Sequence, residues 1–555
     1  MMTSKPGHGV ANHNSSSYFA LSIVPLLMLG TAFLSGCSDE AANVDDAVKI
    51  HPLSTASTDS KSGLSVNAGD TRFAIWQAVD AQERSTTGAE NTLHDAISGA
   101  HVDHVHSIEQ RRNRVMVGLG NANGWISTTS LQTGEWQDSQ RVRRDATNNT
   151  LLGIDAVYDR DYAIQTAIAS DGTGKATALW TQKNVNGIVD LYRCAYGTSG
   201  WCVTPAILDT ATSVSIKDPQ IALNSSGDGL AVWLQKDGNV WAVYGADYVS
   251  GVWRAPARIS DVDANNNAIE SGDVRVSLSD NGAGFAVWKQ AIDNAGISAD
   301  MVQYAIQARR YAASAWAGST LQVSDGLGSA AKPDISMIFD ATDDRAIIVW
   351  QQSDATNSTD FGPIPNLDVL ARTSIWARAY DSGAPVAAAT AIQTDDLSTV
   401  VNEDLQKAFD VRVAIDANGN ATAVWVQEEI VAVGDNKWNN TSATRIWANR
   451  YSAGSTSWGS ATMLEGGTRL DAIDPQVVNV AGKAVVAWRQ WNEPVDASAY
   501  NVYARTYNAN WSAKMLIAAS TFSDKDFISL AASSTTATVS YTAANGGIET
   551  ATITP

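Results

Sequence analysis

The densest group of potential metal ligands lies at residues 94–106, in the stretch HDAISGAHVDHVH. Imidazole nitrogens and carboxylate oxygens at this density can hold Zn²⁺, Cu²⁺ or Ni²⁺. No motif with fixed ligand spacing is present, so a polar connection between two structural units is the alternative interpretation. The candidate ligands are His94, His101, Asp103, His104 and His106.

A second stretch, DVDANNNAIESGD at residues 261–273, begins like a calcium-binding loop with Asp261, Asp263 and Asn265. It lacks the glycine at the sixth position and the acidic residue at the twelfth position of an EF-hand loop. Weak Ca²⁺ binding and no binding are both compatible with this pattern.

A third group combines aromatic rings with polar side chains in the connections between predicted strands. An indole ring can stack on a sugar ring while neighbouring amides and carboxylates hydrogen-bond the sugar hydroxyls. The alternative is that these side chains only fix the loops that carry them. The candidate ligand-binding residues are Asp360, Phe361, Trp438, Trp491, Asn492 and Glu493.

Recognised catalytic motifs are missing from the sequence, which has no Gly-x-Ser-x-Gly elbow, no His-Glu-x-x-His and no Cys/His nucleophile pair. Glu428 and Glu429 could act as the carboxylates of a glycoside hydrolase. Sialidases are propellers, but their Asp-box, Ser-x-Asp-x-Gly-x-x-Trp, differs from the repeat of this chain. We therefore predict that the protein is not an enzyme, and a glycoside hydrolase of sialidase-like architecture is the less favoured alternative.

The elements that must position these residues are tandem repeats. The stretch GDGLAVWLQ at residues 227–235 returns with small changes along most of the chain, which is typical of repeated structural modules. Four short strands can be assigned within residues 218–260, and the second of them is apolar on both faces, as in a sheet covered on both sides. The repeat is anchored by Trp180, Trp233, Trp288, Trp350, Trp425 and Trp488.

This pattern predicts an all-β fold, a β-propeller of about eight four-stranded blades, with seven or nine as alternatives. We expect the strand near residues 47–54 to complete the blade formed by residues 527–555, so that N- and C-terminal strands close the ring. All but two of the 19 tryptophans fall at repeat positions, where packing between blades explains them. The glutamine two residues after each anchor tryptophan is expected to be buried and to cap strand-end backbone groups.

The N-terminal region resembles a bacterial lipoprotein signal. An apolar run at residues 18–34 ends in Leu34-Ser35-Gly36-Cys37, which is similar to a lipobox, and this resemblance implies that Cys37 is lipidated after cleavage. Ser38 after the cysteine implies sorting to the outer membrane of a Gram-negative envelope. The predicted organisation is therefore a signal peptide at 1–36, a lipidated cysteine and flexible acidic linker at 37–63, and a propeller at 64–555.

The remaining cysteines, Cys194 and Cys202, flank a short polar turn, and in an exported protein they predict a disulfide worth about 2–3 kcal/mol. The formal net charge of −20 disfavours nucleic acid as a partner.

A lipoprotein that is nearly all propeller resembles, in layout only, the propeller lipoprotein of the outer-membrane barrel-assembly machinery. This layout favours a membrane-anchored, non-catalytic protein that docks an envelope protein through its loop-rich face. The alternative is a glycan-binding, lectin-like surface module.

Overall fold

The computed structural model describes all-β structure within a compact unit, Asp45–Pro555, while residues 1–44 form a second unit that lies outside the described residues. Before residue 165 only strand segments are described, at 48–52, 62–66, 72–79, 124–132, 135–136 and 140–141. From there the described ranges are 165–171, 174–183, 188–197, 200–202, 205–209, 214–292, 303–325, 329–340, 342–353, 373–393, 407–431, 441–466, 471–491, 500–521, 528–542 and 548–555.

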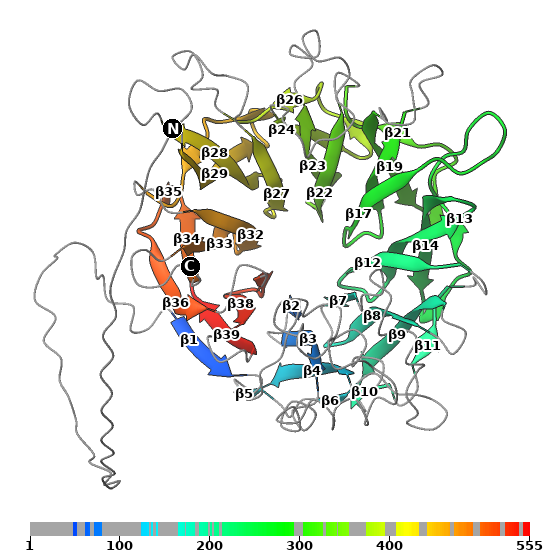
Figure 1. The fold of residues 1–555 in the computed structure, drawn as a ribbon, viewed down its shortest axis with the longest axis horizontal. Coiled ribbons are helices and arrows are strands. Elements are labelled where there is room, and N and C mark those ends of the chain that lie inside the picture. Colours follow the sequence, from blue (N-terminus) through cyan, green and yellow to red (C-terminus); the bar gives the residue numbers. More distant parts are fainter. Residues whose placement is uncertain are drawn as a thin grey trace, which may run out of the picture. The chain divides into compact units, whose positions relative to one another are not determined.

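Eight antiparallel sheets make up this described part of the chain, and consecutive strands pair within each sheet (Figure 1). The first strands are β2 (Ser62–Val66), β7 (Thr166–Ser170), β12 (Ile216–Leu223), β17 (Ser271–Leu278), β22 (Ala330–Phe339), β27 (Ala408–Ile415), β32 (Ala472–Val480) and β37 (Ser529–Ala532). The second strands are β3 (Arg72–Val79), β8 (Ala176–Lys183), β13 (Gly229–Asp237), β18 (Gly284–Ala291), β23 (Asp344–Ser353), β28 (Ala421–Val431), β33 (Lys483–Trp491) and β38 (Ala537–Thr542).

The third strands are β4 (Gly124–Gln132), β9 (Val189–Gly197), β14 (Val240–Val249), β19 (Tyr304–Ala312), β24 (Thr373–Asp381), β29 (Thr441–Ser452), β34 (Tyr500–Asn508) and β39 (Ile548–Ile553). In seven sheets the outer strand is split into two short segments that pair with the same third strand. These segments are β5 (Glu135–Trp136), β6 (Gln140–Arg141), β10 (Gly200–Trp201), β11 (Ala206–Ile207), β15 (Val252–Trp253), β16 (Ala257–Arg258), β20 (Ala315–Trp316), β21 (Leu321–Gln322), β25 (Ala384–Pro385), β26 (Thr390–Ala391), β30 (Ser457–Trp458), β31 (Thr462–Met463), β35 (Asn510–Trp511) and β36 (Met515–Thr521). The predicted all-β fold of four-stranded antiparallel sheets is thus confirmed.

The outer strand of the remaining sheet comes from the other end of the chain. β1 (Val48–Pro52) pairs antiparallel with β39, and the register joins Val48 to Ile553, which is the pairing expected from the sequence. β1 lies inside the segment 37–63 that was assigned to a linker. The first strands of consecutive sheets contact one another from β2 to β37, and β37 also contacts β2.

The cores lie between neighbouring sheets. The six anchor tryptophans are fully buried, which confirms that they are packing elements. One such core contains Trp233 of β13 together with Leu179 and Leu191 from the preceding sheet. Tryptophans of the outer strands pack on third-strand tyrosines, for example Trp253 on Tyr248. Because each interface has its own core, the chain does not need one large central core.

Close approach of neighbouring sheets explains one glycine. A Cβ atom at Gly245 of β14 would lie 3.1 Å from the Trp316 ring of β20 in the next sheet. Any side chain at position 245 would therefore push Trp316 away from the core between these two sheets.

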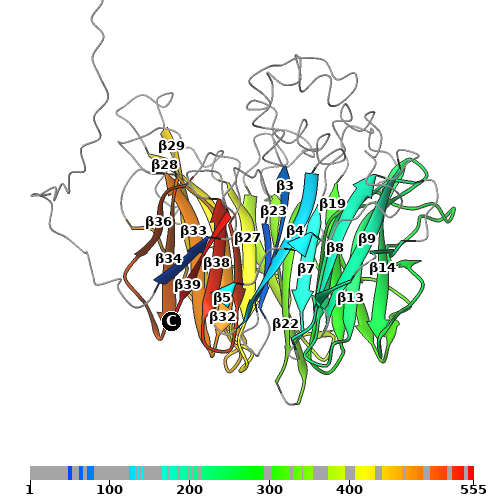
Figure 2. The ribbon, with the colours of Figure 1, turned by 90° about the horizontal axis from the view of Figure 1, so that it is seen from below.

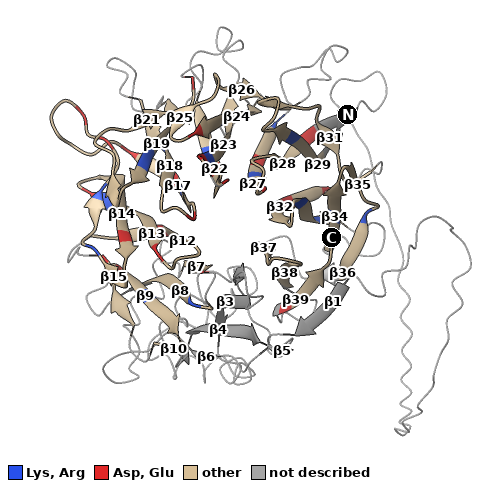
Figure 3. Ribbon diagram, turned by 180° about the vertical axis from the view of Figure 1, so that it is seen from behind, with Lys and Arg blue, Asp and Glu red and all other residues tan. Residues whose placement is uncertain are grey.

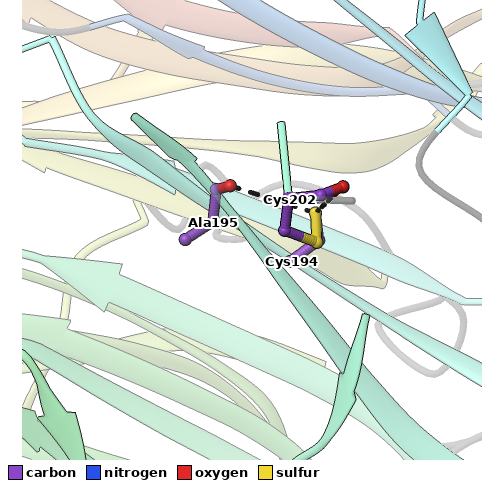
Figure 4. The surroundings of a disulfide bond; sticks show 3 residues. All are labelled: Cys194, Ala195 and Cys202. Carbon is purple, nitrogen blue, oxygen red and sulfur yellow. Dashed lines mark hydrogen bonds between the residues drawn. A yellow bond between two sulfur atoms is a disulfide. The ribbon is translucent and has the colours of Figure 1, made fainter. Parts of the chain in front are cut away.

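The predicted disulfide is present. Cys194 of β9 is bonded to Cys202, which follows β10, so the bond ties the third strand to the outer edge of its sheet (Figure 4). The backbone N–H of Cys202 also donates to the Ala195 carbonyl at 3.0 Å. The described part of the chain contains no helix with the length and apolar character needed to span a bilayer.

Candidate functional site

The candidate site lies at the end of the sheets where second strands finish and first and third strands begin. We call this end the strand-end face. Figure 2 shows the strands running between this end of the unit and the opposite one. The connections from second to third strands start and finish here, and such connections on a rigid scaffold are the usual carriers of binding residues.

Three third strands carry an aromatic residue in the same register, as their first residue in β19 and β34 and as their second residue in β14. Trp241 lies opposite Lys236 in β13, Tyr304 lies opposite Ala291 in β18, and Tyr500 lies opposite Trp491 in β33. Their common register places all three rings at the strand-end face. A cation lies over each ring, and such contacts are worth about 0.5–1 kcal/mol at exposed sites.

Trp241 carries two cations. The Nζ atoms of Lys217 and Lys236 lie 4.2 Å and 4.9 Å from its ring centroid. The backbone N–H of Trp241 donates to Oε2 of Glu270, at 3.0 Å, which comes from the segment leading into the next sheet. The Trp241 ring is half-buried and packs on the core between these two sheets.

The other two rings each have one cation that is paired with a carboxylate. Lys289 lies 5.3 Å from the Tyr304 ring and 3.1 Å from Asp273. Arg489 lies 5.3 Å from the Tyr500 ring and forms an ion pair with Asp474. Burial raises the pKa of the Tyr304 hydroxyl, which keeps it protonated and able to donate at neutral pH.

Asp273 and Asp474 belong to a set of bulged residues on the first strands. Each bulge has a non-glycine residue at positive φ, and the register shifts beside it. This conformation is sparsely populated, and functional sites often contain it. The set comprises Asp218, Asp273, Lys332, Asp410 and Asp474. Figure 3 shows charged residues on the first strands that carry these bulges.

Arg275, Asp334 and Arg412 each lie two residues after one of these bulged residues. Their side chains form a charge network between neighbouring sheets. The Asp334 carboxylate lies 4.0 Å from Arg275 and accepts the backbone N–H of Val413 at 2.9 Å. Burial lowers the pKa of Arg275 and raises the pKa of Asp334. Burial also acts to lower the pKa of Arg412, but nearby carboxylates, Asp410 first among them, outweigh it and raise that pKa.

The sequence analysis missed these bulged residues and the charge network. Their signal is the motif Asp-Pro-Gln or Asp-Val-Arg, which recurs in the first strands as DPQ at 218–220 and 474–476 and as DVR at 273–275 and 410–412. The motif was visible, but only the folded sheets bring its charged side chains from different repeats into contact.

Glu428 is an acid at this face whose pKa is raised. It is half-buried near the end of β28, opposite Thr444. Burial raises the pKa of its carboxyl group; the positive charge of Lys407 opposes this rise, and the negative charge of Asp471 adds to it. A carboxylic acid that stays protonated closer to neutral pH can donate a proton to a leaving group.

Glu465 is a buried acid with a structural role. Its Oε2 atom accepts the backbone N–H of Ile446 at 2.7 Å, and its Oε1 atom lies 3.2 Å from Arg445. Two other sheets use Ser260 and Ser324 for the same backbone contact. Burial raises the pKa of Glu465 to about 7, so its protonation changes near neutral pH.

Of the predicted ligand-binding residues, only Trp491 lies within the described part of the chain. It is the last residue of β33, not part of a connection as predicted, because the strand continues to its pairing with Tyr500. Its backbone N–H donates to the Asp471 carbonyl at 2.8 Å. The other predicted positions, which lie outside the described residues, are Asp360, Phe361, Trp438, Asn492 and Glu493.

The metal and lipidation predictions also fall outside the described residues, at Cys37, His94, His101, Asp103, His104 and His106. Within the described ranges, no three His, Cys, Asp or Glu side chains lie together as a metal site would require. In the stretch 261–273, Asp263 accepts backbone N–H groups from Asn265 and Asn267, both at 2.8 Å. This carboxylate is therefore engaged in closing its own turn.

Comparison with known proteins gives matches only among solved structures. No family model and no curated protein sequence matches the chain. The GH93 α-L-arabinofuranosidase of Fusarium graminearum is 10% identical, with a TM-score of 0.35, and the match covers 62% of this chain and 96% of that chain. A polysaccharide lyase of family PL25, an ulvan lyase, is 9% identical, with a TM-score of 0.38 and coverage of 87% and 90%. The microbial sialidase Hz136 is 10% identical, with a TM-score of 0.33 and coverage of 66% and 73%.

These matches correct one sequence-based prediction. The matched structures include glycoside hydrolases and a polysaccharide lyase, so the prediction that this protein is not an enzyme is contradicted. That prediction rested on the lack of a recognised motif, and a motif search does not detect carboxylates that come together only in the fold.

Proposed function

We propose that the protein is a lipid-anchored β-propeller that binds a carbohydrate at its strand-end face. The proposal includes closure of the eight sheets into a ring of eight blades. Ring closure is supported by the contacts between successive first strands, by the contact of β37 with β2, and by the pairing of β1 with β39. A closed ring brings Trp241, Tyr304 and Tyr500, which lie on third strands of different sheets, to the same face of the ring.

The observation that carries this proposal is the repeated set of ring and charged groups at Trp241, Tyr304 and Tyr500. Aromatic faces stack on the apolar C–H faces of sugars, and the adjacent charged groups can hydrogen-bond sugar hydroxyls. The sets at Trp241 and Tyr304 belong to neighbouring sheets, whose first strands β12 and β17 are in contact, so these two could contact neighbouring residues of an extended glycan. We do not carry forward the protein-docking scaffold, because these side chains offer polar groups around rings instead of a continuous apolar patch.

Membrane attachment through Cys37 completes the proposal. A lipidated Cys37 would hold the carbohydrate-binding unit at the outer-membrane surface without a spanning segment. The acidic chain would be repelled from bare anionic lipid, so attachment would depend on the acyl chains.

Binding to a glycan array, measured with the full chain purified in detergent, tests the carbohydrate proposal. Wild-type protein should bind a restricted set of polysaccharides, and Tyr304→Ala should weaken that binding. Trp253→Ala is the matched control, since this half-buried ring lies on the outer strand β15 and is paired with Tyr248, away from the strand-end face. Equal loss in both variants, or no binding by the wild type, would contradict the proposal.

A second candidate function is cleavage of the bound glycan, and the pKa of Glu428 favours it. Burial raises this pKa, as expected of a general acid in a glycoside hydrolase. Formation of new sugar ends from a polysaccharide that the array identifies would be measured for wild type and Glu428→Gln. Cleavage that disappears in Glu428→Gln while binding persists supports this function. Cleavage that is unchanged in the variant contradicts the role of Glu428.

A further inference from the structure

The group formed by Lys217, Lys236 and Trp241 differs from the corresponding groups around Tyr304 and Tyr500 at the strand-end face. Lys217 lies opposite Leu234 and Lys236 lies opposite Trp241 in the antiparallel pairings of β13. Residues 234 and 236 are two positions apart, so all of these side chains project from the same face of the sheet. That face packs against the next sheet, since Leu234 is buried in the core that contains Val274 and Trp288. The two lysines and the indole therefore lie where the interface between these two sheets reaches the strand-end face.

Neither lysine has a carboxylate within ion-pair distance among the described residues. The Nζ atom of Lys236 donates to the Asn239 carbonyl at 2.9 Å, and Lys217 has its ring contact with Trp241. In the equivalent sets, Lys289 is paired with Asp273 and Arg489 with Asp474. Only at Trp241 do two ammonium groups share one ring without such a counter-charge in the described part of the chain.

This arrangement selects for a negatively charged ligand. Two ammonium groups near one ring repel each other, and the negative face of the indole offsets only part of that repulsion. A carboxylate or sulfate placed between them would gain two charge-assisted hydrogen bonds. The formal charge of −20 makes the rest of the chain repulsive to such a ligand, so binding at this group would also be selective in position.

We propose that Lys217, Trp241 and Lys236 form a subsite for an acidic sugar, in which the ring contacts the sugar face and the two lysines hold its carboxylate or sulfate. This inference rests on the carbohydrate-binding function and specifies its ligand class. Glu270 has a positioning role, because its carboxylate holds the backbone N–H of Trp241 and so fixes the start of β14.

The test uses pairs of glycans that differ in charge alone. The first pair is an oligogalacturonate and its methyl ester. The second pair is a sulfated galactan oligomer and its desulfated form. Binding of each glycan to the full chain in detergent is measured for wild type, for the double variant Lys217→Gln/Lys236→Gln, and for the control Lys175→Gln. Lys175 is an exposed lysine at the opposite end of the strands in the preceding sheet, and its loss changes the net charge without touching the site.

The proposal predicts that the charged member of one pair binds at least about tenfold more tightly than its neutral partner. The double variant should lose this preference while keeping the weaker neutral binding, and Lys175→Gln should retain the preference. The pair that shows the effect identifies carboxylate or sulfate as the group recognised. Equal affinity for charged and neutral members in the wild type would overturn the acidic-sugar inference but leave carbohydrate binding intact. Failure of every glycan to bind would overturn both.

Discussion

The indole N–H of Trp350 donates a hydrogen bond of 2.8 Å to Oε1 of Gln352, two residues further along β23. The same contact joins tryptophan and glutamine in four other sheets, at 3.0–3.4 Å. Residues i and i+2 of a strand face the same side, so the glutamine can reach the indole without leaving the sheet. The recurrence of this glutamine thus follows from a buried donor that needs an acceptor, whereas the sequence analysis expected it to cap the backbone.

Removing one such acceptor should destabilise the fold. Gln235→Met keeps the shape of the side chain but leaves the buried N–H of Trp233 without its acceptor, which should cost about 1–3 kcal/mol in unfolding free energy. The measurement is urea unfolding of the full chain. Gln322→Met, at an exposed position of β21, is the control and should change stability by no more than about 0.5 kcal/mol. Equal stability of Gln235→Met and wild type would contradict this role of the glutamine.

The charge network between first strands should contribute to the joining of neighbouring sheets. Asp334→Ala removes the acceptor of the Val413 N–H and the carboxylate beside Arg275, and should lower the unfolding free energy by about 2 kcal/mol. The matched control is Asp280→Ala. Asp280 also accepts a backbone N–H from a neighbouring sheet, that of Ser225, but it is exposed to solvent. An equal loss of unfolding free energy in Asp280→Ala would contradict a larger contribution from the buried network.

Glu465 predicts a specific dependence of stability on pH. Its folded-state pKa of about 7 lies above the ordinary value of 4.5, so ionisation is harder in the folded chain than in the unfolded chain. Its contribution to stability is therefore largest below pH 4.5 and falls as the pH rises toward 7, by at most about 3 kcal/mol. Glu465→Gln should flatten the change in unfolding free energy between pH 5 and pH 8 by about this amount. Parallel pH profiles for variant and wild type would rule out this titration.

Lipid attachment at Cys37 is testable by phase partitioning. Wild-type protein expressed in a Gram-negative host should enter the detergent phase of a Triton X-114 extraction, because acyl chains dominate its partitioning. Cys37→Ser should move to the aqueous phase, while Cys202→Ser, which alters a cysteine that is not in the lipobox, should remain in the detergent phase. Wild type in the aqueous phase would contradict anchoring.

The sequence predicted those features that depend on local periodicity. The buried tryptophans, the four-stranded sheets and the pairing of β1 with β39 follow from apolar alternation and from the repeat itself. The Cys194–Cys202 bond follows from two cysteines on either side of one turn.

Most of the candidate site could not be predicted in this way, because it depends on the register between strands and on contacts between sheets. Lys217 is 24 residues from Trp241 in the chain, and they come together only because β13 pairs with both β12 and β14. Asp334 and Val413 are 79 residues apart, and their hydrogen bond joins two neighbouring sheets. The position of Trp491 was wrong by the one residue that separates a strand end from a connection, and strand boundaries are the least reliable part of a prediction from sequence.

The most direct test of carbohydrate binding at the strand-end face is the dissociation constant of the full chain for its best glycan, compared between Trp241→Ala and Trp253→Ala. Both changes remove a half-buried indole, but only Trp241 lies at the strand-end face. We predict that Trp241→Ala weakens binding by about tenfold or more and that Trp253→Ala leaves it within about twofold of wild type. Unchanged binding in Trp241→Ala, with the fold intact, would contradict the account.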